Sequence, residues 1–226
     1  MLVHSLLHPM IITWLGHSAF KLQGKGHSDT VTVVTDPFYS EKTGLKLPRL
    51  EADIVTISHD HDDHNNSEAV KGNPHIITGA GEYEIKGVFI EGVPSYHDEE
   101  KGSKRGGNII YRFEIEDLSI THLGDLGTEL DNKQLESLEG TDILLVPVGG
   151  IYTINAAKAV TVINQIEPRI VIPMHYQIPG LKLSNELATL ETFLKAIAIK
   201  PRQEEKLKIS KKDLPQEIME VVVLSF

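Results

Sequence analysis

The segment that most constrains this chain is residues 58–64, which read Ser-His-Asp-His-Asp-Asp-His directly after an apolar run. Side chains at i and i+2 of an extended segment point to the same side, so His59 and His61 can reach one cation together. Asp63 and His64 follow where the chain turns, and we expect them to face a neighbouring position. The segment indicates a metal site on a strand-to-helix loop, and the alternative is an acidic, solvated loop with stray histidines.

The composition narrows the choice of ligand and partner. The chain has no cysteine, so a metal could be held only by His, Asp and Glu, a set that suits zinc, manganese or iron. The formal net charge of −10 disfavours non-specific binding of nucleic acid, which needs a basic surface. No apolar run is long enough to span a bilayer, and residues 1–10 lack the features of a signal peptide. We therefore expect a cytoplasmic protein without a membrane partner.

Short β-branched runs alternate with turn residues and a few helical patterns. Strands are expected over residues 11–14, 19–22, 30–35, 53–58, 75–78, 82–86, 88–93, 108–115, 118–122, 142–148, 169–174, 207–209 and 220–224. Helices are expected over residues 66–71, 130–138, 155–166 and 185–197. This order favours a layered α/β domain with two sheets inside and helices outside. Because there is no internal repeat or linker, we expect one domain over residues 1–226, with residues 1–9 as an N-terminal extension.

Further metal ligands are expected from distant parts of the chain, each at the end of a strand. His97 follows the run 88–93, Asp125 follows 118–122, and His175 follows 169–174. Any one of them alone is more often structural. Together with the His-Asp segment they favour a site with two metals, because that chemistry needs ligands from several segments.

With these candidate ligands, the chain resembles the metallo-β-lactamase superfamily. The resemblance rests on the order of Asp36, His59-x-His61-x-Asp63-His64, His97, Asp125 and His175. Flanking phrases are similar to the branch of small metal-dependent hydrolases that includes ascorbate phosphate lactonases: Trp14-Leu15-Gly16-His17-Ser18, Thr35-Asp36-Pro37, His122-x-Gly124-Asp125, Pro147-Val148-Gly149-Gly150 and Pro173-Met174-His175-Tyr176.

This resemblance implies a four-layer αβ/βα sandwich with two internal mixed β-sheets and a site at one edge. It implies two divalent metal ions, zinc first and manganese or iron as alternatives. His59, His61 and His97 would bind the first ion, Asp63, His64 and His175 the second, and Asp125 would bridge them. Asp36 and His17 would lie beside the ions without binding them. Catalytic roles would fall to Asp63, Asp125 and His122.

The function implied is hydrolysis of a small molecule. Two cations about 3.5–4 Å apart would acidify a water and polarise a carbonyl or phosphoryl oxygen. We expect cleavage of an ester, lactone or phosphoester, with an anionic or phosphorylated substrate. The alternatives are a nuclease or phosphodiesterase of the same superfamily, and a metal-binding regulatory module without catalysis. His61 favours hydrolysis, because the redox-active flavodiiron members usually carry Glu there. Association into a homo-oligomer is left open.

Weaker signals have two readings each. Residues 101–107 could present Lys104 and Arg105 to a phosphorylated substrate, or could be a solvated loop. Residues 149–153 with Asn155 could place a helix N-terminus before an anion, or could be a plain connection. Residues expected to lie near the site or in solvent are Asp60, Asp62 and Asp98. Histidines without a partner pattern are His4, His8, His27 and His75, and the expected core aromatics are Trp14, Phe20 and Phe38.

Overall fold

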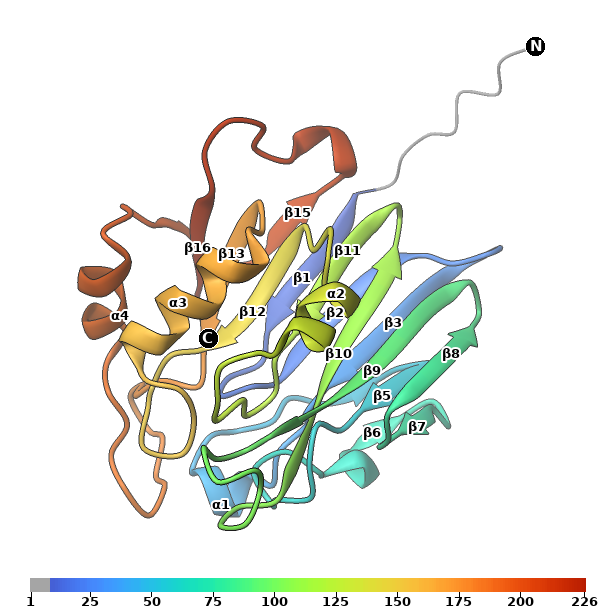
Figure 1. The fold of residues 1–226 in the computed structure, drawn as a ribbon. Coiled ribbons are helices and arrows are strands. Elements are labelled where there is room, and N and C mark those ends of the chain that lie inside the picture. Colours follow the sequence, from blue (N-terminus) through green and yellow to red (C-terminus); the bar gives the residue numbers. More distant parts are fainter. Residues whose placement is uncertain (1–8) are drawn as a thin grey trace.

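The computed structural model describes residues 9–226, and Figure 1 shows its layers. The expectations for His4, His8 and most of the extension at residues 1–9 lie outside the described residues, and Pro9 is exposed. Two β-sheets face each other. In the described part of the chain, no helix is both long enough and apolar enough to cross a membrane.

The first sheet has six strands and is mixed. Its order is β15-β1-β2-β3-β5-β7, with parallel pairing of β3 to β5 and of β5 to β7 and antiparallel pairing elsewhere. The strands are β1 (Met10–Trp14), β2 (Phe20–Lys25), β3 (Thr30–Thr35), β5 (Ile54–Thr56), β7 (His75–Ile77) and β15 (Leu207–Ile209). A separate two-stranded ribbon pairs β4 (Leu50–Glu51) with β6 (Val70–Lys71).

The second sheet has eight strands and is also mixed. Its order is β14-β16-β13-β12-β11-β10-β9-β8, parallel from β14 to β11 and antiparallel from β11 to β8. The strands are β8 (Gly81–Ile85), β9 (Val88–Tyr96), β10 (Gly107–Ile115), β11 (Leu118–His122), β12 (Ile143–Pro147), β13 (Ile170–Met174), β14 (Arg202–Glu204) and β16 (Glu220–Leu224). Strands β11, β12 and β13 are buried at every residue, as parallel strands covered on both faces are.

Helices cover the outer face of the second sheet. They are α2 (Asn132–Ser137), α3 (Ala156–Ile166) and α4 (Leu190–Ile197), and α3 packs on β12 and α4 (Figure 1). The outer layer on the first sheet is thinner. It consists of the one-turn helix α1 (Ser40–Thr43), the β4–β6 ribbon and loops, and it buries Val34 and Val55 beneath Phe38 and Leu45.

The two sheets share one apolar core. Phe20 and Val33 from the first sheet belong to the same buried cluster as Phe113 and Leu144 from the second. Trp14, Phe20 and Phe38 are buried, as expected. The predicted α/β sandwich with two internal mixed sheets is therefore confirmed. The shared core supports one domain, which stays a prediction for the whole of residues 1–226.

Two predicted helices differ from the structure. Residues 66–71 form a 3₁₀ turn, Ser67–Ala69, followed by β6. The reason is that Val70 pairs with Leu50 and packs into the buried cluster beneath the outer layer of the first sheet. The helix expected from residue 185 begins only at Leu190. Residues before it are held in extended form, because Leu187 N–H donates to the Gln177 side chain and Ala188 N–H to the Gly149 carbonyl. The short elements α1, β4 and β14 were not predicted.

The strand directions place the site. In the first sheet β1, β3 and β5 run in one direction, and in the second sheet β9, β11, β12 and β13 run parallel to one another. The loops that follow β9, β12 and β13 gather around α1 at the lower end of Figure 1. Loops at the carboxyl ends of parallel strands are where α/β folds place ligand-binding side chains.

Candidate metal centre

Each predicted metal ligand directly follows a strand that ends at this edge. His59, His61, Asp63 and His64 follow β5, and His97 follows β9. Asp125 follows β11, and His175 follows β13. Segments more than a hundred residues apart in the chain thus bring their polar side chains to one place.

The centre of the cluster is the Asp125 carboxylate, which is 2% exposed. Its Oδ2 atom lies 3.2 Å from His175 Nε2, 3.3 Å from His64 Nε2 and 3.4 Å from His97 Nε2. His59 Nε2 is 3.9 Å away. Four imidazoles therefore aim the same ring nitrogen at one buried carboxylate oxygen.

Three overlapping groups have ligand atoms within 4.8 Å of one another. The first is His59, His61 and His97, the trio predicted for one ion. The second contains Asp63, His64 and His175, the trio predicted for the other ion, and adds His17. The third joins both through Asp125: it holds His59, His64 and Asp125. His61 is exposed on the solvent side, whereas His64 and His175 are buried.

Asp36 fixes the orientation of two of these histidines without entering a group. Its carboxylate accepts the Ser58 backbone N–H at 2.8 Å, the Ser58 hydroxyl at 2.6 Å and His64 Nδ1–H at 2.9 Å. Because the Ser58 hydroxyl donates to Asp36, its oxygen accepts His59 Nδ1–H at 2.9 Å. Both rings therefore carry a proton on Nδ1 and aim Nε2 at Asp125. A carboxylate behind a histidine is the usual partner of a metal-binding imidazole.

Charge in the cluster is shared between the carboxylates and His64. Burial alone would raise the pKa of Asp125, but neighbouring His175 and His64 hold it well below the usual value. Burial alone would lower the pKa of His64, but Asp125 and Asp63 raise it well above the ordinary 6.5. Without a cation, His64 therefore carries the positive charge that these carboxylates require.

The His59 and His97 imidazoles of the cluster are poor bases. Burial, with His64 nearby, lowers the pKa of His59 to about 3. Burial also lowers the pKa of His97, which Asp125 only partly offsets. Both rings are neutral near pH 7, which is the form that binds a metal.

The donor set fits divalent cations. Among the described residues, no hydrogen-bond partner exists for the buried atoms His59 Nε2, His64 Nε2, His175 Nε2 and Asp125 Oδ1, all of which belong to the cluster. Buried polar atoms normally have a partner, so several unpartnered ones that converge on one point indicate a binding site for a cation. Nitrogen and carboxylate oxygen without sulfur suit zinc, manganese or iron.

His17 lies closer to the cluster than predicted. It is fully buried, its Nε2 is 3.2 Å from Asp63 Oδ2, and its ring centre is 4.2 Å from that of His175. Burial, with His175 nearby, lowers the pKa of His17 to about 4. Its backbone is left-handed, with φ 52°, as is that of Asp36 (41°) and His175 (51°). Strained backbone of this kind clusters at functional sites.

The structure does not bring His122 into the cluster, which corrects its predicted catalytic role. Its Nε2–H donates to the Ser18 carbonyl at 2.8 Å, and its Nδ1 accepts the Gly124 N–H at 3.1 Å. Burial lowers its pKa, so the ring is neutral near pH 7. With both nitrogens used by backbone, the ring has none left for a proton transfer.

Asn108 was missed by the sequence reasoning. This buried residue of β10 accepts the Asp125 N–H through Oδ1 at 2.9 Å. Its Nδ2 donates to the Ser95 hydroxyl at 2.7 Å and to the Leu123 carbonyl at 2.9 Å. A lone amide inside a strand carries no pattern that would reveal this contact. The role of Ser58, whose hydroxyl links Asp36 to His59, was likewise not predicted.

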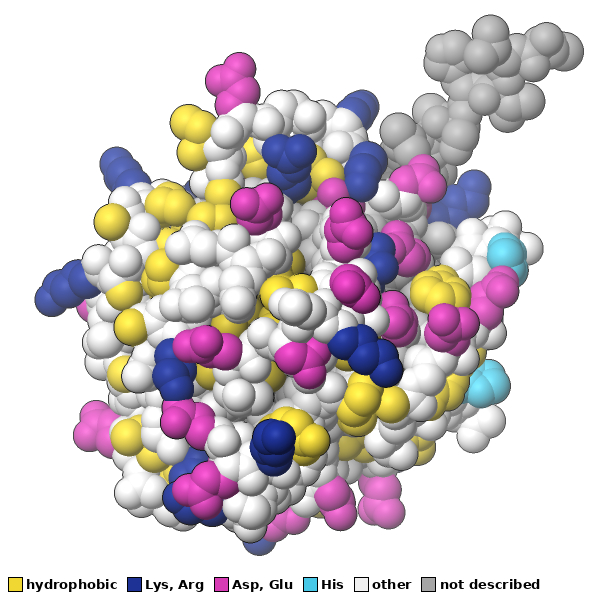
Figure 2. All heavy atoms as spheres, in the orientation of Figure 1, with side chains coloured by type: hydrophobic (Ala, Val, Ile, Leu, Met, Phe, Trp, Pro, Cys, Tyr) yellow, Lys and Arg dark blue, Asp and Glu magenta, His cyan; other side chains and the backbone are white. Residues whose placement is uncertain are grey.

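A cleft of about 430 Å³ opens above the cluster, and His61, Asp63, His97 and Asp125 form part of its wall. Figure 2 shows Lys and Arg side chains interspersed with Asp and Glu on the lower end of the molecule, where this cleft lies. A larger hollow of about 830 Å³ lies elsewhere, around Glu139 and Arg169. None of the ligand groups found among residues 9–226 borders that hollow.

The residues with weaker sequence signals lie outside the metal-ligand cluster. Asp60 and Asp62 are exposed: Asp60 accepts from Asn65 at 2.6 Å, and Asp62 pairs with Lys42 at 2.6 Å. Asn155 caps α3 with its own side chain, which accepts the Lys158 N–H at 3.0 Å and so favours the plain connection. His27 and His75 are exposed and stand apart from the cluster.

Comparison with known proteins now identifies the family. The profile of the Beta-lactamase superfamily domain matches residues 11–175, so the chain belongs to that superfamily. Curated relatives named UPF0173 metal-dependent hydrolase include one from Thermococcus onnurineus, 31% identical over 73% of this chain and 84% of the relative. Another relative of the same name, from Methanosarcina mazei, is 32% identical over 73% of this chain and 82% of the relative. Within the superfamily the chain belongs to these metal-dependent hydrolases, and it is an enzyme.

Solved structures that are similar to this chain support the same superfamily. A Thermotoga maritima protein assigned to the metallo-beta-lactamase superfamily shares 36% identity, covers 95% of this chain and 98% of its own, and gives a TM-score of 0.77. The metallo-beta-lactamase fold protein YhfI from Bacillus subtilis, at 11% identity, shows the fold alone, with a TM-score of 0.58 and 96% coverage of each chain. The finer similarity to ascorbate phosphate lactonases stays a prediction.

Proposed function

We propose that this enzyme uses two divalent metal ions to hydrolyse an ester, lactone or phosphoester bond of a small molecule. The observation that carries the proposal is the convergence of four imidazole Nε2 atoms on Asp125 Oδ2, at 3.2 to 3.9 Å. One carboxylate oxygen among two groups of histidines is the arrangement that a bridging ligand requires.

The residues divide between two ions. His59, His61 and His97 would hold the first, and Asp63, His64 and His175 the second, with Asp125 between them. Such ions would be zinc, with manganese or iron as alternatives. They would acidify a bound water and polarise the carbonyl or phosphoryl oxygen of the substrate.

The chain's own residues prepare this chemistry. Asp36 and Ser58 fix the tautomers of His59 and His64, so that both present Nε2. Asp63 is partly exposed toward the cleft and ionised, since the neighbouring His64 and His17 lower its pKa despite burial. It is therefore the ionised carboxylate best placed to orient a water near the substrate. His122 acts at a distance, by tying Gly124 to the Ser18 loop.

The test is metal-dependent turnover. The purified protein, loaded in turn with Zn²⁺, Mn²⁺ or Fe²⁺, is assayed on aryl esters, lactones and phosphodiesters, and separately on tRNA and single-stranded DNA. His61→Ala and Asp125→Ala are expected to lose both metal and activity, whereas His75→Ala, which changes an exposed histidine, keeps both. Metal-dependent activity retained in Asp125→Ala would refute the assignment. Turnover of nucleic acid alone would favour the nuclease, and bound metal without turnover the regulatory module.

A further inference from the structure

The group of residues around the second ion is larger than the sequence predicted. Four residues each offer one donor atom within 4.8 Å of the others: His17, Asp63, His64 and His175. The group of the first ion has three histidines. His17 is the additional member of the second group, and the resemblance to the superfamily had implied that it lies beside the ions without binding them. With Asp125 shared, the second ion has five candidate protein ligands and the first has four.

The distances within the second group are those expected of atoms around one ion. His17 Nε2 lies 3.2 Å from Asp63 Oδ2, and His64 Nε2 lies 3.7 Å from the same oxygen. His175 Nε2 lies 3.2 Å from Asp125 Oδ2. Atoms bound at about 2.0–2.2 Å to one four- or five-coordinate zinc ion lie about 3–3.7 Å apart. A hydrogen bond alone would explain the contact of His17 with Asp63. It would not explain why the same ring faces the donor atoms of His64 and His175.

His17 shares its surroundings with the predicted ligand His175. Both side chains are fully buried, both backbones are left-handed, with φ 52° and 51°, and the two ring centres are 4.2 Å apart. In both rings Nδ1 has no hydrogen-bond partner among the described residues. The His175 backbone N–H donates to the His17 carbonyl at 3.2 Å, so the two turns are joined directly. The two histidines are therefore equivalent in burial, backbone and hydrogen bonding.

The turn that carries His17 holds the ring in place. Leu15 N–H donates to the Ala19 carbonyl at 2.8 Å, and Ala19 N–H donates to the Gly16 carbonyl at 2.9 Å. The Trp14 indole N–H donates to the His17 carbonyl at 2.9 Å. A residue other than glycine seldom adopts a left-handed backbone, and where it does the surrounding structure must enforce it, often at a functional site. His17 is therefore fixed before any ion binds, as a metal ligand should be.

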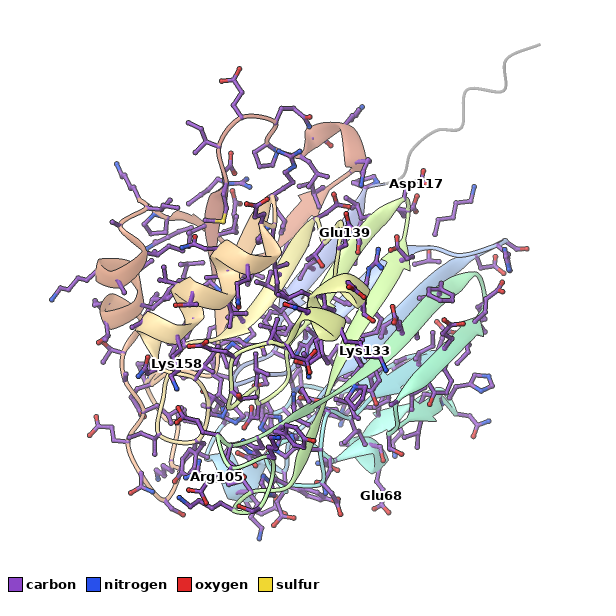
Figure 3. The ribbon with its side chains drawn as sticks, viewed as in Figure 1. Glu68, Arg105, Asp117, Lys133, Glu139 and Lys158 are labelled. Carbon is purple, nitrogen blue, oxygen red and sulfur yellow. The ribbon has the colours of Figure 1, made fainter. Side chains whose placement is uncertain are left out.

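The two groups differ in their access to the cleft. Asp63 of the second group borders the cleft, whereas the three histidines of that group are fully buried. His61 and His97 of the first group lie on the cleft wall, and His61 is exposed. Arg105, another residue of this wall, marks the position of the cleft in Figure 3, at the lower end of the molecule. A substrate that enters the cleft therefore meets the first group before the histidines of the second.

We propose that His17 binds the second ion directly, together with the three other members of its group and Asp125. The inference rests on the proposed function and gives the two ions different tasks. A metal site to which the protein supplies every ligand is closed and typical of structural ions, whereas a catalytic ion keeps an open position. The second ion is then closed, and the first ion keeps the open position that water and substrate require.

Crystals of the zinc-loaded protein test the assignment. Anomalous diffraction is expected to place the second ion about 2.0–2.1 Å from His17 Nε2. A distance beyond about 3 Å, too long for a bond to zinc, would overturn the proposal. The same crystals soaked in acetohydroxamate test the open position. The hydroxamate oxygens are expected on the ion beside His61, and a bond from them to the ion beside His17 would overturn the closed site.

Two variants in solution separate a metal ligand from a hydrogen-bond donor. His17→Gln keeps an amide N–H for Asp63 but removes the imidazole nitrogen, and His17→Ala removes both groups. Each is expected to weaken binding of the second ion by about 100-fold or more, measured as zinc retained per chain in competition with a chelator. His75→Gln, at an exposed histidine, is the control. Full zinc affinity in His17→Gln with a loss in His17→Ala would show that His17 only positions Asp63.

Failure of the proposed function is distinguishable from failure of this inference. The proposed function is tested by turnover, whereas the role of His17 is tested by the position of the ion and by zinc affinity, neither of which requires turnover. A zinc-loaded protein that binds its second ion through His17 but cleaves no ester, lactone or phosphodiester would refute the proposed function alone. Metal-dependent turnover by a protein whose two ions both lie away from His17 would refute the inference alone.

Discussion

Asn108 Oδ1 accepts the backbone N–H of Asp125 at 2.9 Å, and this contact sets the central carboxylate of the cluster against β10. The amide nitrogen of Asn108 is fully used as well, by Ser95 and Leu123. One side chain in the second sheet thus fixes the loop that carries Asp125.

We therefore predict that Asn108→Ala weakens metal binding and lowers the free energy of unfolding by about 2–3 kcal/mol, because buried donors and acceptors lose their partner. Urea unfolding and chelator competition measure the two effects. Ser95→Ala removes only one partner of the amide and is expected to leave metal affinity unchanged. Unaltered metal affinity in Asn108→Ala would show that Asp125 does not depend on this contact.

The Asp36 carboxylate supports both His59 and His64, so its loss reaches both predicted metal positions. Asp36→Asn replaces one acceptor oxygen by a donor. It therefore cannot accept both the Ser58 backbone N–H, which binds Oδ1, and the pair formed by the Ser58 hydroxyl and His64 Nδ1–H, which binds Oδ2. Metal affinity is expected to fall about 10- to 100-fold, the usual cost of losing a carboxylate behind a metal-binding histidine. Asp60→Asn changes an exposed carboxylate that accepts a hydrogen bond from Asn65, and it is the control in the same chelator competition. A drop of equal size in both variants would contradict the role given to Asp36.

The buried neutral imidazoles make the metal-free protein sensitive to acid. The unfolded chain protonates His17 and His59 near pH 6.5, whereas folding lowers their pKa values to about 4 and about 3. Between these values the unfolded state binds more protons, so the free energy of unfolding falls as pH falls from 6.5 to 4. Each histidine contributes up to about 1.4 kcal/mol per pH unit. His64, whose pKa is raised, is protonated in both states below pH 6.5 and adds no slope in this window.

Urea unfolding of the metal-free protein at several pH values between 4 and 6.5 checks this prediction. His17→Gln removes one of the histidines whose pKa folding lowers and should reduce the slope. His75→Gln, at an exposed histidine, should leave it unchanged. A slope that is the same in wild type and His17→Gln would rule out this account of His17.

Gly124 has no room for a side chain. Its backbone is left-handed, with φ 56°, and a Cβ atom there would lie 2.3 Å from Asn108 Oδ1 and 2.6 Å from Ser58 Cβ. Gly140 is a matched control, because it is also left-handed, with φ 77°, and a Cβ atom there meets nothing within 4 Å. Gly140→Ala should cost about 1–2 kcal/mol, the strain of the left-handed backbone alone. Gly124→Ala should cost more in urea unfolding and should also reduce metal content, and equal costs would contradict the close packing.

The sequence was sufficient for much of this picture. Strand limits such as residues 30–35 and 118–122 followed from β-branched runs ended by turn residues, and these strands appear with the same bounds. The convergence of the candidate ligands could be predicted because each stands after a strand, and strands that run in one direction bring their following loops to one edge. The helix at Asn155 was recognisable from its capping residue.

Other features depend on contacts that only the folded chain creates. The late start of α4 follows from hydrogen bonds of Leu187 and Ala188 with Gln177 and Gly149, which are far away in sequence. His122 lies in a phrase shared with the family, yet its ring nitrogens bind backbone rather than face the cluster. Arg105 and Lys104 are neighbours in one basic run. Only the loop geometry set by Asp98, which accepts the backbone N–H of both, places Arg105 on the cleft wall beside Tyr152.

The central claim is that two ions share Asp125, and anomalous diffraction from crystals of the zinc-loaded protein tests it most directly. The account predicts two peaks about 3.5–4 Å apart on either side of Asp125, one beside His59, His61 and His97 and the other beside Asp63, His64 and His175. A single peak, or peaks away from Asp125, would contradict it.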